Sequence, residues 1–294
     1  MIINMKIIDI FESKKVTISF EVFPPKENSQ FDNVISTVGK LSGLKPDYMS
    51  VTYGAGGGTS GNTAKIADYI ENELGVTALA HLTCVSSTAE EVSRLLDELK
   101  NRKIQNILAL RGDIPKDSEY PTTRHYCYAT QLINEIKQKG GFCVGAACYP
   151  EGHIENANKE NDIIHLKEKV DAGCDFLVTQ LFFDNNVFYN FLYRLLQKDI
   201  NVPIDAGIMP VTNIKSIRRM TQLSGATLTP KYKAMIDRFE HSPKALYQAG
   251  IAYAVEQIID LISNGVKGIH IYTMNKPEIA EAIMSGISDV VRGE

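Results

Sequence analysis

The feature that most constrains this chain is a short, nearly all-apolar run followed by a stretch with helical spacing, a unit that recurs along the whole sequence. Short apolar runs of this kind are typical of strands buried on both faces, as in parallel sheets covered by helices. We therefore expect an α/β protein. The predicted strands are Val16–Val22, Asp47–Thr52, Val76–His81, Ile104–Leu110, Phe142–Ala147, Phe176–Thr179, Pro203–Gly207 and Gly268–Tyr272.

The segments between these runs have the periodicity and end signals of helices. In Val92–Leu99 the apolar residues fall at helical spacing, and Thr88 followed by Glu91 predicts a capping box in front of them. The range 229–264 holds two helical patterns in a row, and Pro243 opens the second at a favoured first-turn position. Strand–helix alternation of this kind fits a doubly wound open sheet or a (β/α)8 TIM barrel with extra helices, and eight units favour the barrel.

Polar residues follow the carboxyl end of nearly every predicted strand. In a closed barrel these ends converge on one mouth, whereas in an open sheet they lie along a line and cannot all meet one ligand. Any one of these residues also fits an ordinary strand-to-loop transition, but together they favour a single site. They are Glu21, Thr52, His81, Arg111, Asp113, Tyr149, Gln180, Tyr272 and Thr273.

Charge and hydropathy exclude several classes of protein. Thirty-one Lys and Arg against 35 Asp and Glu give a net charge of −4, which argues against a nucleic-acid surface. The longest apolar runs fall short of the ~18 residues that a membrane-spanning helix needs. Lys6, Asp9 and Glu12 interrupt the apolar residues near the start, so we expect no signal peptide and a cytoplasmic protein.

Several common site motifs are absent or incomplete. The five cysteines have no CxxC pair, so we expect buried free thiols, and the six histidines show no HExxH pattern, so we expect no metal. The stretch Gly56–Gly61 matches GxGxxG, but the next strand ends at His81 without the acidic residue that a dinucleotide fold requires. We interpret it as a loop that borders the site.

Two charged positions suggest chemistry. Glu21 ends the first strand among apolar neighbours, where loss of hydration raises the proton affinity of a carboxyl group and suits it to general-acid work. The alternative is a structural carboxylate paired with an arginine. Arg111 can hold a phosphate or carboxylate bidentately, and Gly112 next to it allows a planar ligand to approach the backbone.

At these residues the chain resembles the methylenetetrahydrofolate reductases of the short bacterial type, along essentially its whole length. The matching segments keep the order and separations of that family. They are Ser19–Lys26, Ser50–Gly57, His81–Cys84, Leu108–Asp113, Tyr149–His153, Leu166–Asp184, Gly207–Asn213 and Ile271–Lys276.

The resemblance implies one (β/α)8 barrel spanning residues 1–294, without the C-terminal regulatory domain of the eukaryotic enzymes. It implies a non-covalent FAD at the barrel mouth and reduction of 5,10-methylenetetrahydrofolate to 5-methyltetrahydrofolate, for methionine supply. Hydride would pass through FAD in a ping-pong sequence, with NAD(P)H as reductant and NADH favoured over NADPH. A homo-oligomer is also expected.

The resemblance also implies residue roles. Glu21 matches the acid that protonates N10 of the folate, Asp113 matches the aspartate between flavin and pterin, and Gln180 matches a glutamine that contacts folate and nicotinamide. Ile214 and Lys276 match further substrate-binding positions. The expected FAD-binding residues are Thr52, Tyr53, Ala55, His81, Arg111, Gly112, Asp113, Tyr128, Ala129, Tyr149, His153, Asp162, His165 and Lys169.

Three positions depart from the family pattern. Ile214 stands where the family often has Phe, Glu168 where bacterial relatives often have a basic residue, and Lys276 where an Arg would meet the folate tail. Two other functions remain open at this stage: a flavin-free, folate-dependent methyltransferase barrel, and a non-catalytic partner that binds folate or flavin. The first predicts a colourless protein, and the second predicts bound ligand without hydride transfer.

Overall fold

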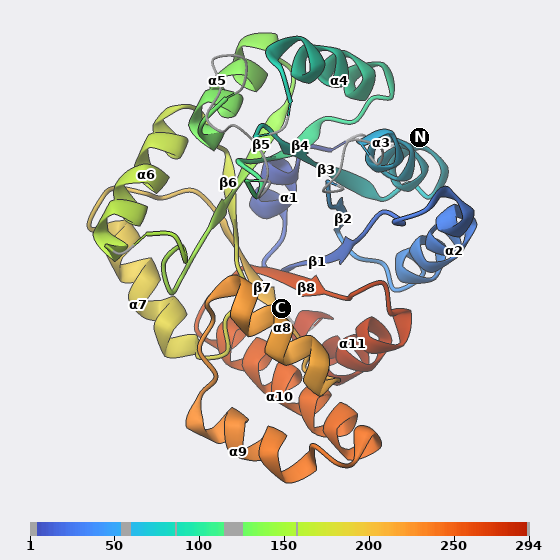
Figure 1. Cartoon of the computed structure of the whole chain (residues 1–294), viewed down its shortest axis with the longest axis vertical. Helices are drawn as coiled ribbons and strands as arrows, with labels where there is room; N and C mark the ends of the chain where they lie inside the picture. Colours follow the sequence, from blue (N-terminus) through green and yellow to red (C-terminus); the bar gives the residue numbers. More distant parts are fainter. Residues whose placement is uncertain (1–4, 54–59, 86, 115–125, 157, 293–294) are drawn as a thin grey trace.

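The strands form a closed parallel barrel in the order in which they occur along the chain (Figure 1). The computed structural model describes residues 5–53, 60–85, 87–114, 126–156 and 158–292. The last strand pairs with the first, with His270 opposite Ser19, and this pairing closes the barrel. The strands are β1 (Thr17–Val22), β2 (Tyr48–Val51), β3 (Thr77–Thr83), β4 (Asn106–Leu110), β5 (Cys143–Cys148), β6 (Phe176–Thr179), β7 (Ile204–Ile208) and β8 (Gly268–Tyr272).

Helices surround the barrel, and they include extra ones before β1 and between β7 and β8 (Figure 1). The predicted TIM barrel with extra helices is therefore confirmed. The α-helices are α1 (Ile7–Ser13), α2 (Phe31–Ser42), α3 (Ser60–Asp68), α4 (Ala89–Asn101), α5 (Ala129–Lys139), α6 (Lys159–Asp171), α7 (Asn185–Leu196), α8 (Ile214–Ser224), α9 (Pro230–Phe239), α10 (Pro243–Ser263) and α11 (Pro277–Arg292). A 3₁₀ turn, η1 (Asn28–Gln30), precedes α2, and a π-helical segment, η2 (Tyr69–Glu73), extends α3.

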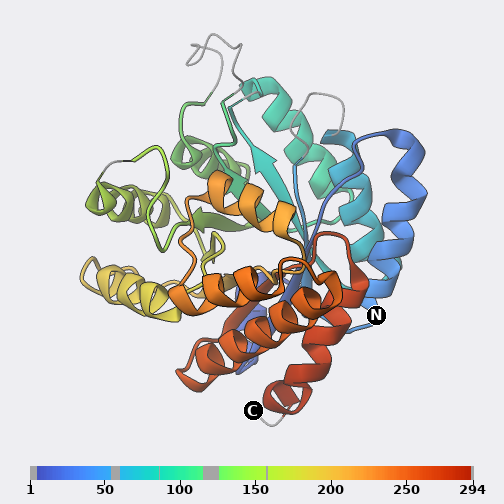
Figure 2. The ribbon, with the colours of Figure 1, turned by 60° about the horizontal axis from the view of Figure 1, so that its bottom comes forward.

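The predicted end signals of the helices act as expected. The Thr88 hydroxyl accepts from the Glu91 backbone N–H while the Glu91 carboxylate accepts from the Thr88 N–H, so the capping box before α4 is confirmed. Pro243 occupies the first turn of α10. The preceding helix, α9, packs along α10 on the outside of the barrel (Figure 2). Tyr232 of α9 stacks on Tyr253 of α10 with ring centroids 3.8 Å apart.

The amino-terminal helix α1 closes the bottom of the barrel. Its Ile7, Ile10 and Phe11 are buried against interior residues of the strands, among them Tyr48 and Phe176. In Figure 1 this helix lies inside the ring of outer helices. Because one end of the barrel is sealed in this way, a ligand reaches the interior from the carboxyl ends of the strands.

The described part of the chain contains no helix that is both long and apolar enough to cross a membrane. None of the five cysteines, all of which are described, forms a disulfide. Four of them are buried as predicted, while Cys127 is only partly buried.

Candidate active site

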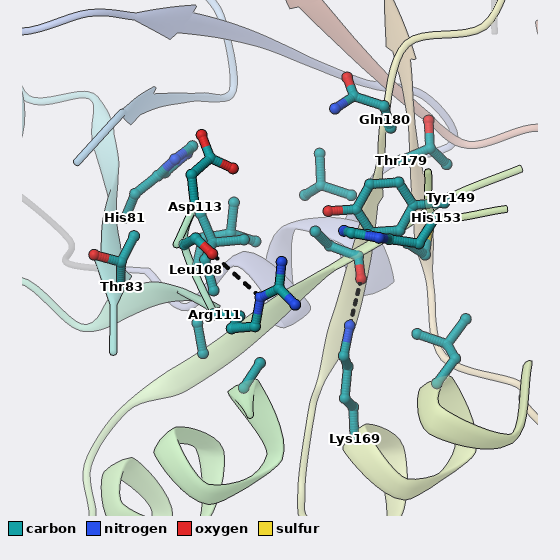
Figure 3. Close-up of a pocket in the computed structure, with 18 of the residues that line it drawn as sticks. His81, Thr83, Leu108, Arg111, Asp113, Tyr149, His153, Lys169, Thr179 and Gln180 are labelled. Atoms are coloured by element: carbon teal, nitrogen blue, oxygen red, sulfur yellow. Dashed lines mark hydrogen bonds between the residues drawn. The ribbon is translucent and has the colours of Figure 1, made fainter. Parts of the chain in front are cut away.

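A cavity of about 1270 Å³ opens at the carboxyl ends of the strands. The polar residues predicted to converge there do so, since every one of them except Thr273 lines this cavity. Figure 3 shows His81 and Asp113 on one side of it and Tyr149, His153 and Gln180 on the other. The predicted site residues that line the cavity are Glu21, Thr52, Tyr53, His81, Arg111, Gly112, Asp113, Tyr128, Ala129, Tyr149, His153, Asp162, His165, Lys169 and Gln180.

Three predicted residues are not in this set. Ala55 lies outside the described residues. Lys276 lines a smaller pocket of about 130 Å³, which shares Met209 and Met220 with the large cavity. Ile214 begins α8 and lines neither space; it is partly buried in the apolar cluster that contains Met209. The substrate-binding roles of Ile214 and Lys276 remain predictions.

Glu21 lies at the inner wall of the cavity and is only 7% exposed. Its Oε2 atom is 3.8 Å from Nε2 of His81 and 3.7 Å from Nε2 of His270. Its backbone carbonyl accepts a hydrogen bond from the Thr273 hydroxyl, which holds the end of β1 against the end of β8. Among the described residues the titratable side chains closest to its carboxyl group are therefore histidines, not the arginine of the structural alternative.

His81 faces Glu21 as a neutral imidazole. Burial lowers the pKa of His81 to about 4, against a smaller upward effect from Glu21, and its Nε2 has no hydrogen-bond partner within the described structure. An unpartnered nitrogen at the wall of a ligand cavity is available to a ligand. This position suits the predicted contact with a cofactor.

The segment after β4 brings a cation, a glycine and an acid to the mouth. The Arg111 guanidinium forms a 2.7 Å ion pair with Glu155, a residue that the sequence did not single out. Gly112 has a φ of +86°, and a Cβ there would lie 3.0 Å from Thr83 and Val85 side-chain atoms. Its glycine is therefore required by backbone conformation and packing, in addition to any ligand approach that the sequence suggested.

Lys169 reaches into the cavity from α6. Its Nζ donates to the carbonyl of Ala147 at 2.9 Å, and burial lowers its pKa (Figure 3). Within the described structure no carboxylate is placed at ion-pair distance from this amine, although Asp162 and Arg111 affect it at longer range. A cation that has only a carbonyl partner fits an anionic ligand group.

The loop after β5 forms another wall. The Asp162 carboxylate accepts from the His153 backbone N–H at 2.6 Å, which ties this loop to α6. The Tyr149 and His153 rings meet edge to face with centroids 4.6 Å apart. Burial and the nearby Arg111 lower the pKa of His153, so this ring is mainly neutral near pH 7.

The outer rim of the cavity carries the remaining predicted positions. His165 and the departure Glu168 form an exposed pair, with 3.2 Å between Nδ1 and Oε2. Tyr128 and Ala129 lie at the start of α5, with the Tyr128 side chain 64% exposed. Glu168 thus has a local partner and adds negative charge to the rim.

Sequence reasoning missed the polar residues inside the barrel. His270 and Asp205 are buried in β8 and β7 below the cavity, and Ser19 bonds to both. A signal was present, because Ser19 precedes Glu21 by two positions and so faces the same side of the strand. A charged Asp205 in an otherwise apolar strand was a second signal.

The described residues contain no cluster of three His, Cys, Asp or Glu side chains that could hold a metal ion. The arrangement is instead a deep cavity with cations for an anionic ligand and with a buried carboxyl group beside two imidazoles. Such a set can bind a large ligand with charged groups and move a proton at its inner end.

Comparison with known proteins agrees with this arrangement. The model of the family described as methylenetetrahydrofolate reductase matches residues 6–288. A 5,10-methylenetetrahydrofolate reductase of Pectobacterium carotovorum is 34% identical over 269 residues, which cover 92% of this chain and 89% of the relative. Methylenetetrahydrofolate reductase (NADH) 1 of Arabidopsis thaliana is 32% identical, and the match covers 96% of this chain and 51% of the plant protein.

A solved structure shares the fold at low sequence identity. It is an uncharacterized Clostridium thermocellum protein that binds two copies of 5-methyl-5,6,7,8-tetrahydrofolic acid. Its TM-score is 0.64 at 16% identity, and the match covers 97% of this chain and 98% of that one. At this identity the likeness supports the barrel fold alone.

Proposed function

The chain belongs to the methylenetetrahydrofolate reductase family, and from this membership we propose that it reduces 5,10-methylenetetrahydrofolate to 5-methyltetrahydrofolate with FAD and NADH. The product would carry a methyl group for methionine synthesis. The observation that supports the reaction most directly is the convergence of the acid Glu21 with Asp113 and Gln180 on one cavity. These are the residues to which the family resemblance gives chemical roles.

The size and charge of the cavity support FAD as its ligand. Its volume of about 1270 Å³ exceeds the ~300–1000 Å³ of ordinary small-molecule pockets, so it can take a large cofactor together with a second ligand. Lys169, with only a carbonyl partner, and Arg111 supply positive charge for a diphosphate. Thr52, His81 and Tyr149 also line the cavity and would contact a planar ring system bound there. The residues present therefore fit the cofactor.

FAD, when bound, would accept a hydride from the nicotinamide and pass it to the one-carbon unit of the folate. The protein's own side chains would deliver the proton, stabilise charge and orient the substrate. Glu21 would give its proton to N10 of the folate, which breaks the C–N10 bond of the five-membered ring and leaves an iminium at N5. Because Glu21 is shielded from bulk water, its proton is delivered at that nitrogen and not lost to solvent.

Asp113 and Gln180 would act on charge and orientation. A carboxylate at Asp113 stabilises the positive charge of the iminium electrostatically as it develops. Gln180 is held by β5 and by its own loop, since its backbone N–H donates to the Cys148 carbonyl at 2.7 Å and its Oε1 accepts from the Leu181 N–H at 2.9 Å. Its amide nitrogen is thereby left to orient a substrate ring.

NADH is the proposed reductant because plant relatives carry it in their names. Those plant proteins are about twice as long as the matched region, whereas the bacterial relatives are matched over nearly their whole length.

One experiment separates this function from the flavin-free methyltransferase and from a non-catalytic binder. The purified protein is mixed anaerobically with NADH or NADPH, and the flavin absorbance is followed, before methylenetetrahydrofolate is added. We expect a yellow protein that bleaches with NADH and regains colour with the folate. A colourless protein supports the methyltransferase, and a yellow protein that stays oxidised with both nucleotides contradicts the proposed reduction.

A further inference from the structure

A polar network of buried side chains lies below Glu21, inside the barrel. Interiors of such barrels are mostly filled by branched apolar side chains. Here Ser19 of β1, Tyr48 of β2, Asp205 of β7 and His270 of β8 occupy the interior, and none is more than 1% exposed. Polar groups in such a place are costly unless they bond to one another, so their arrangement requires a reason.

Within the polar network, the donor and the acceptor of each hydrogen bond can be assigned. Asp205 Oδ2 accepts from the Tyr48 hydroxyl and from the Ser19 hydroxyl, the latter at 3.0 Å. Two other acceptors lie near Ser19 Oγ: the carbonyl of Ile269, farther away at 3.4 Å, and the Tyr48 hydroxyl oxygen, whose own hydrogen goes to Asp205. A hydroxyl has one hydrogen, so Ser19 that donates to Asp205 must accept from Nδ1 of His270, 2.7 Å away.

This assignment of donors and acceptors fixes which nitrogen of His270 carries the hydrogen. With the hydrogen on Nδ1, the ring turns an unprotonated Nε2 toward Glu21, 3.7 Å from its Oε2. An acceptor in that position favours the protonated carboxyl group, which is the form that can give a proton. The opposite tautomer would present an N–H and favour the carboxylate, which cannot.

We propose that Asp205 is a positioning residue that acts through Ser19 to hold His270 in the Nδ1–H tautomer and so keeps Glu21 protonated for the reaction. The role of Glu21 in this statement rests on the proposed function, whereas the tautomer does not. The logic is that of Ser-His-Asp triads, in which a buried carboxylate holds the imidazole in one tautomer. Here a serine hydroxyl stands between carboxylate and ring.

The surroundings of Asp205 agree with a role as an ionised hydrogen-bond acceptor. Its Oδ1 has no hydrogen-bond partner within the described structure. Burial raises the pKa of Asp205 to about 6, while His270, Tyr48 and Ser19 oppose that rise and Asp47 adds to it. Above about pH 6 the Asp205 carboxyl group is therefore mainly ionised, and it can only accept hydrogen bonds, as the polar network requires. His81, which also faces Glu21, is neutral there, and so is the nearby Tyr272, because burial raises its pKa well above the ordinary value.

Histidine nitrogen NMR tests the tautomer directly. Protein labelled with ¹⁵N-histidine is compared with Asp205→Asn at pH 7.5, and His270→Gln assigns the signal. An asparagine amide can donate to Ser19, which then donates to Nδ1 and moves the ring hydrogen to Nε2. We expect Nδ1–H in the wild type and Nε2–H in the variant. An unchanged tautomer, or Nε2–H already in the wild type, overturns the proposal.

Stopped-flow kinetics then tests the consequence. We expect Asp205→Asn and Ser19→Ala each to slow folate reduction about 10- to 100-fold, part of the ~10²–10⁴-fold that a general acid contributes. Flavin reduction by NADH should change less than about threefold. The double variant should be little slower than either single variant, because both substitutions disrupt the same polar network. Ser19→Ala also keeps the test valid if Asp205→Asn does not fold.

Glu71→Gln is the matched control, because Glu71 is another buried carboxyl group with a raised pKa but lies in η2, outside the barrel interior. We expect both half-reactions of this variant to match the wild type. Equal losses in both half-reactions of Asp205→Asn, or fully additive effects with Ser19→Ala, overturn the positioning role. If Glu21→Gln leaves folate reduction intact, the proposed acid is wrong, and the NMR result still decides the tautomer.

Discussion

The Nε2 atom of His270 lies 3.7 Å from Oε2 of Glu21, and Nε2 of His81 lies 3.8 Å from the same oxygen. One carboxyl oxygen is thus placed between two buried imidazoles that come from β8 and β3. Both distances exceed a normal hydrogen bond, so a shift of ~0.7 Å in the Glu21 side chain would form one. The acid therefore sits ready to bond to either ring, or to a ligand.

Glu21→Gln separates the two half-reactions. The amide keeps the shape of the side chain but has no proton to give, and only folate reduction needs that proton. We expect folate reduction to slow by ~10²–10⁴-fold while flavin reduction by NADH stays within about an order of magnitude. Anaerobic stopped-flow absorbance measures both. Equal losses in both steps would mean that Glu21 is structural, and full activity in both would mean that the proton comes from elsewhere.

Lys169→Met should weaken FAD binding. The substitution keeps most of the apolar stem and removes the cation that has only the Ala147 carbonyl as partner. We expect the flavin dissociation constant to rise about 10- to 100-fold, as for a charge-assisted contact of ~1.5–3 kcal/mol. Fluorescence titration of the apoprotein with FAD measures it. Lys159→Met, on an exposed position of the same helix, is the control and should bind FAD like the wild type.

Lys276→Ala should weaken folate binding far more than flavin binding. The lysine follows β8 and lines the smaller pocket beside the main cavity, a position suited to the negative tail of the substrate. One exposed contact of this kind contributes about 0.5–2 kcal/mol. Steady-state kinetics gives the folate KM. The control is Lys267→Ala, which precedes β8 at the closed end of the barrel; an unchanged KM in Lys276→Ala would contradict the assigned contact.

Glu71→Gln should stabilise the protein above neutral pH. Glu71 is 2% exposed, accepts from the Ala78 backbone N–H at 2.7 Å, and has its pKa raised to about 7 by burial. A raised carboxyl pKa means that the folded state loses stability as pH rises from the unfolded value near 4.5 through about 7. Glutamine keeps the acceptor without the charge, so we expect a gain of about 1–3 kcal/mol at pH 8.

Urea unfolding at pH 5 and pH 8 measures this difference. At pH 5 Glu71 is mainly protonated in the folded state, so the variant and the wild type should have similar free energies of unfolding. A variant that is equally stable or less stable than the wild type at pH 8 would show that the Glu71 carboxylate is well accommodated in the fold.

The architecture was readable from local pattern because the signals are short-range. Eight apolar runs with helical segments between them predicted the barrel, and the strand Phe176–Thr179 was placed at its observed bounds. The strand Gly268–Tyr272 was also placed at its observed bounds. The other six strands differ by one or two residues at one or both ends, because pairing with a neighbour decides where a ladder stops. The mouth residues were also predictable, since the carboxyl ends of parallel strands in a closed barrel must face one side.

The polar network inside the barrel could not be predicted in the same way. Ser19 and His270 are separated by 251 positions and meet only because β8 pairs with β1 in one register, and a shift of one residue would turn these side chains away from each other. The sequence by itself determined the barrel and the residues that line its mouth. Tertiary structure alone decided that Asp205 and His270 lie behind Glu21, because closure of the barrel and its register, not local propensity, bring distant strands together.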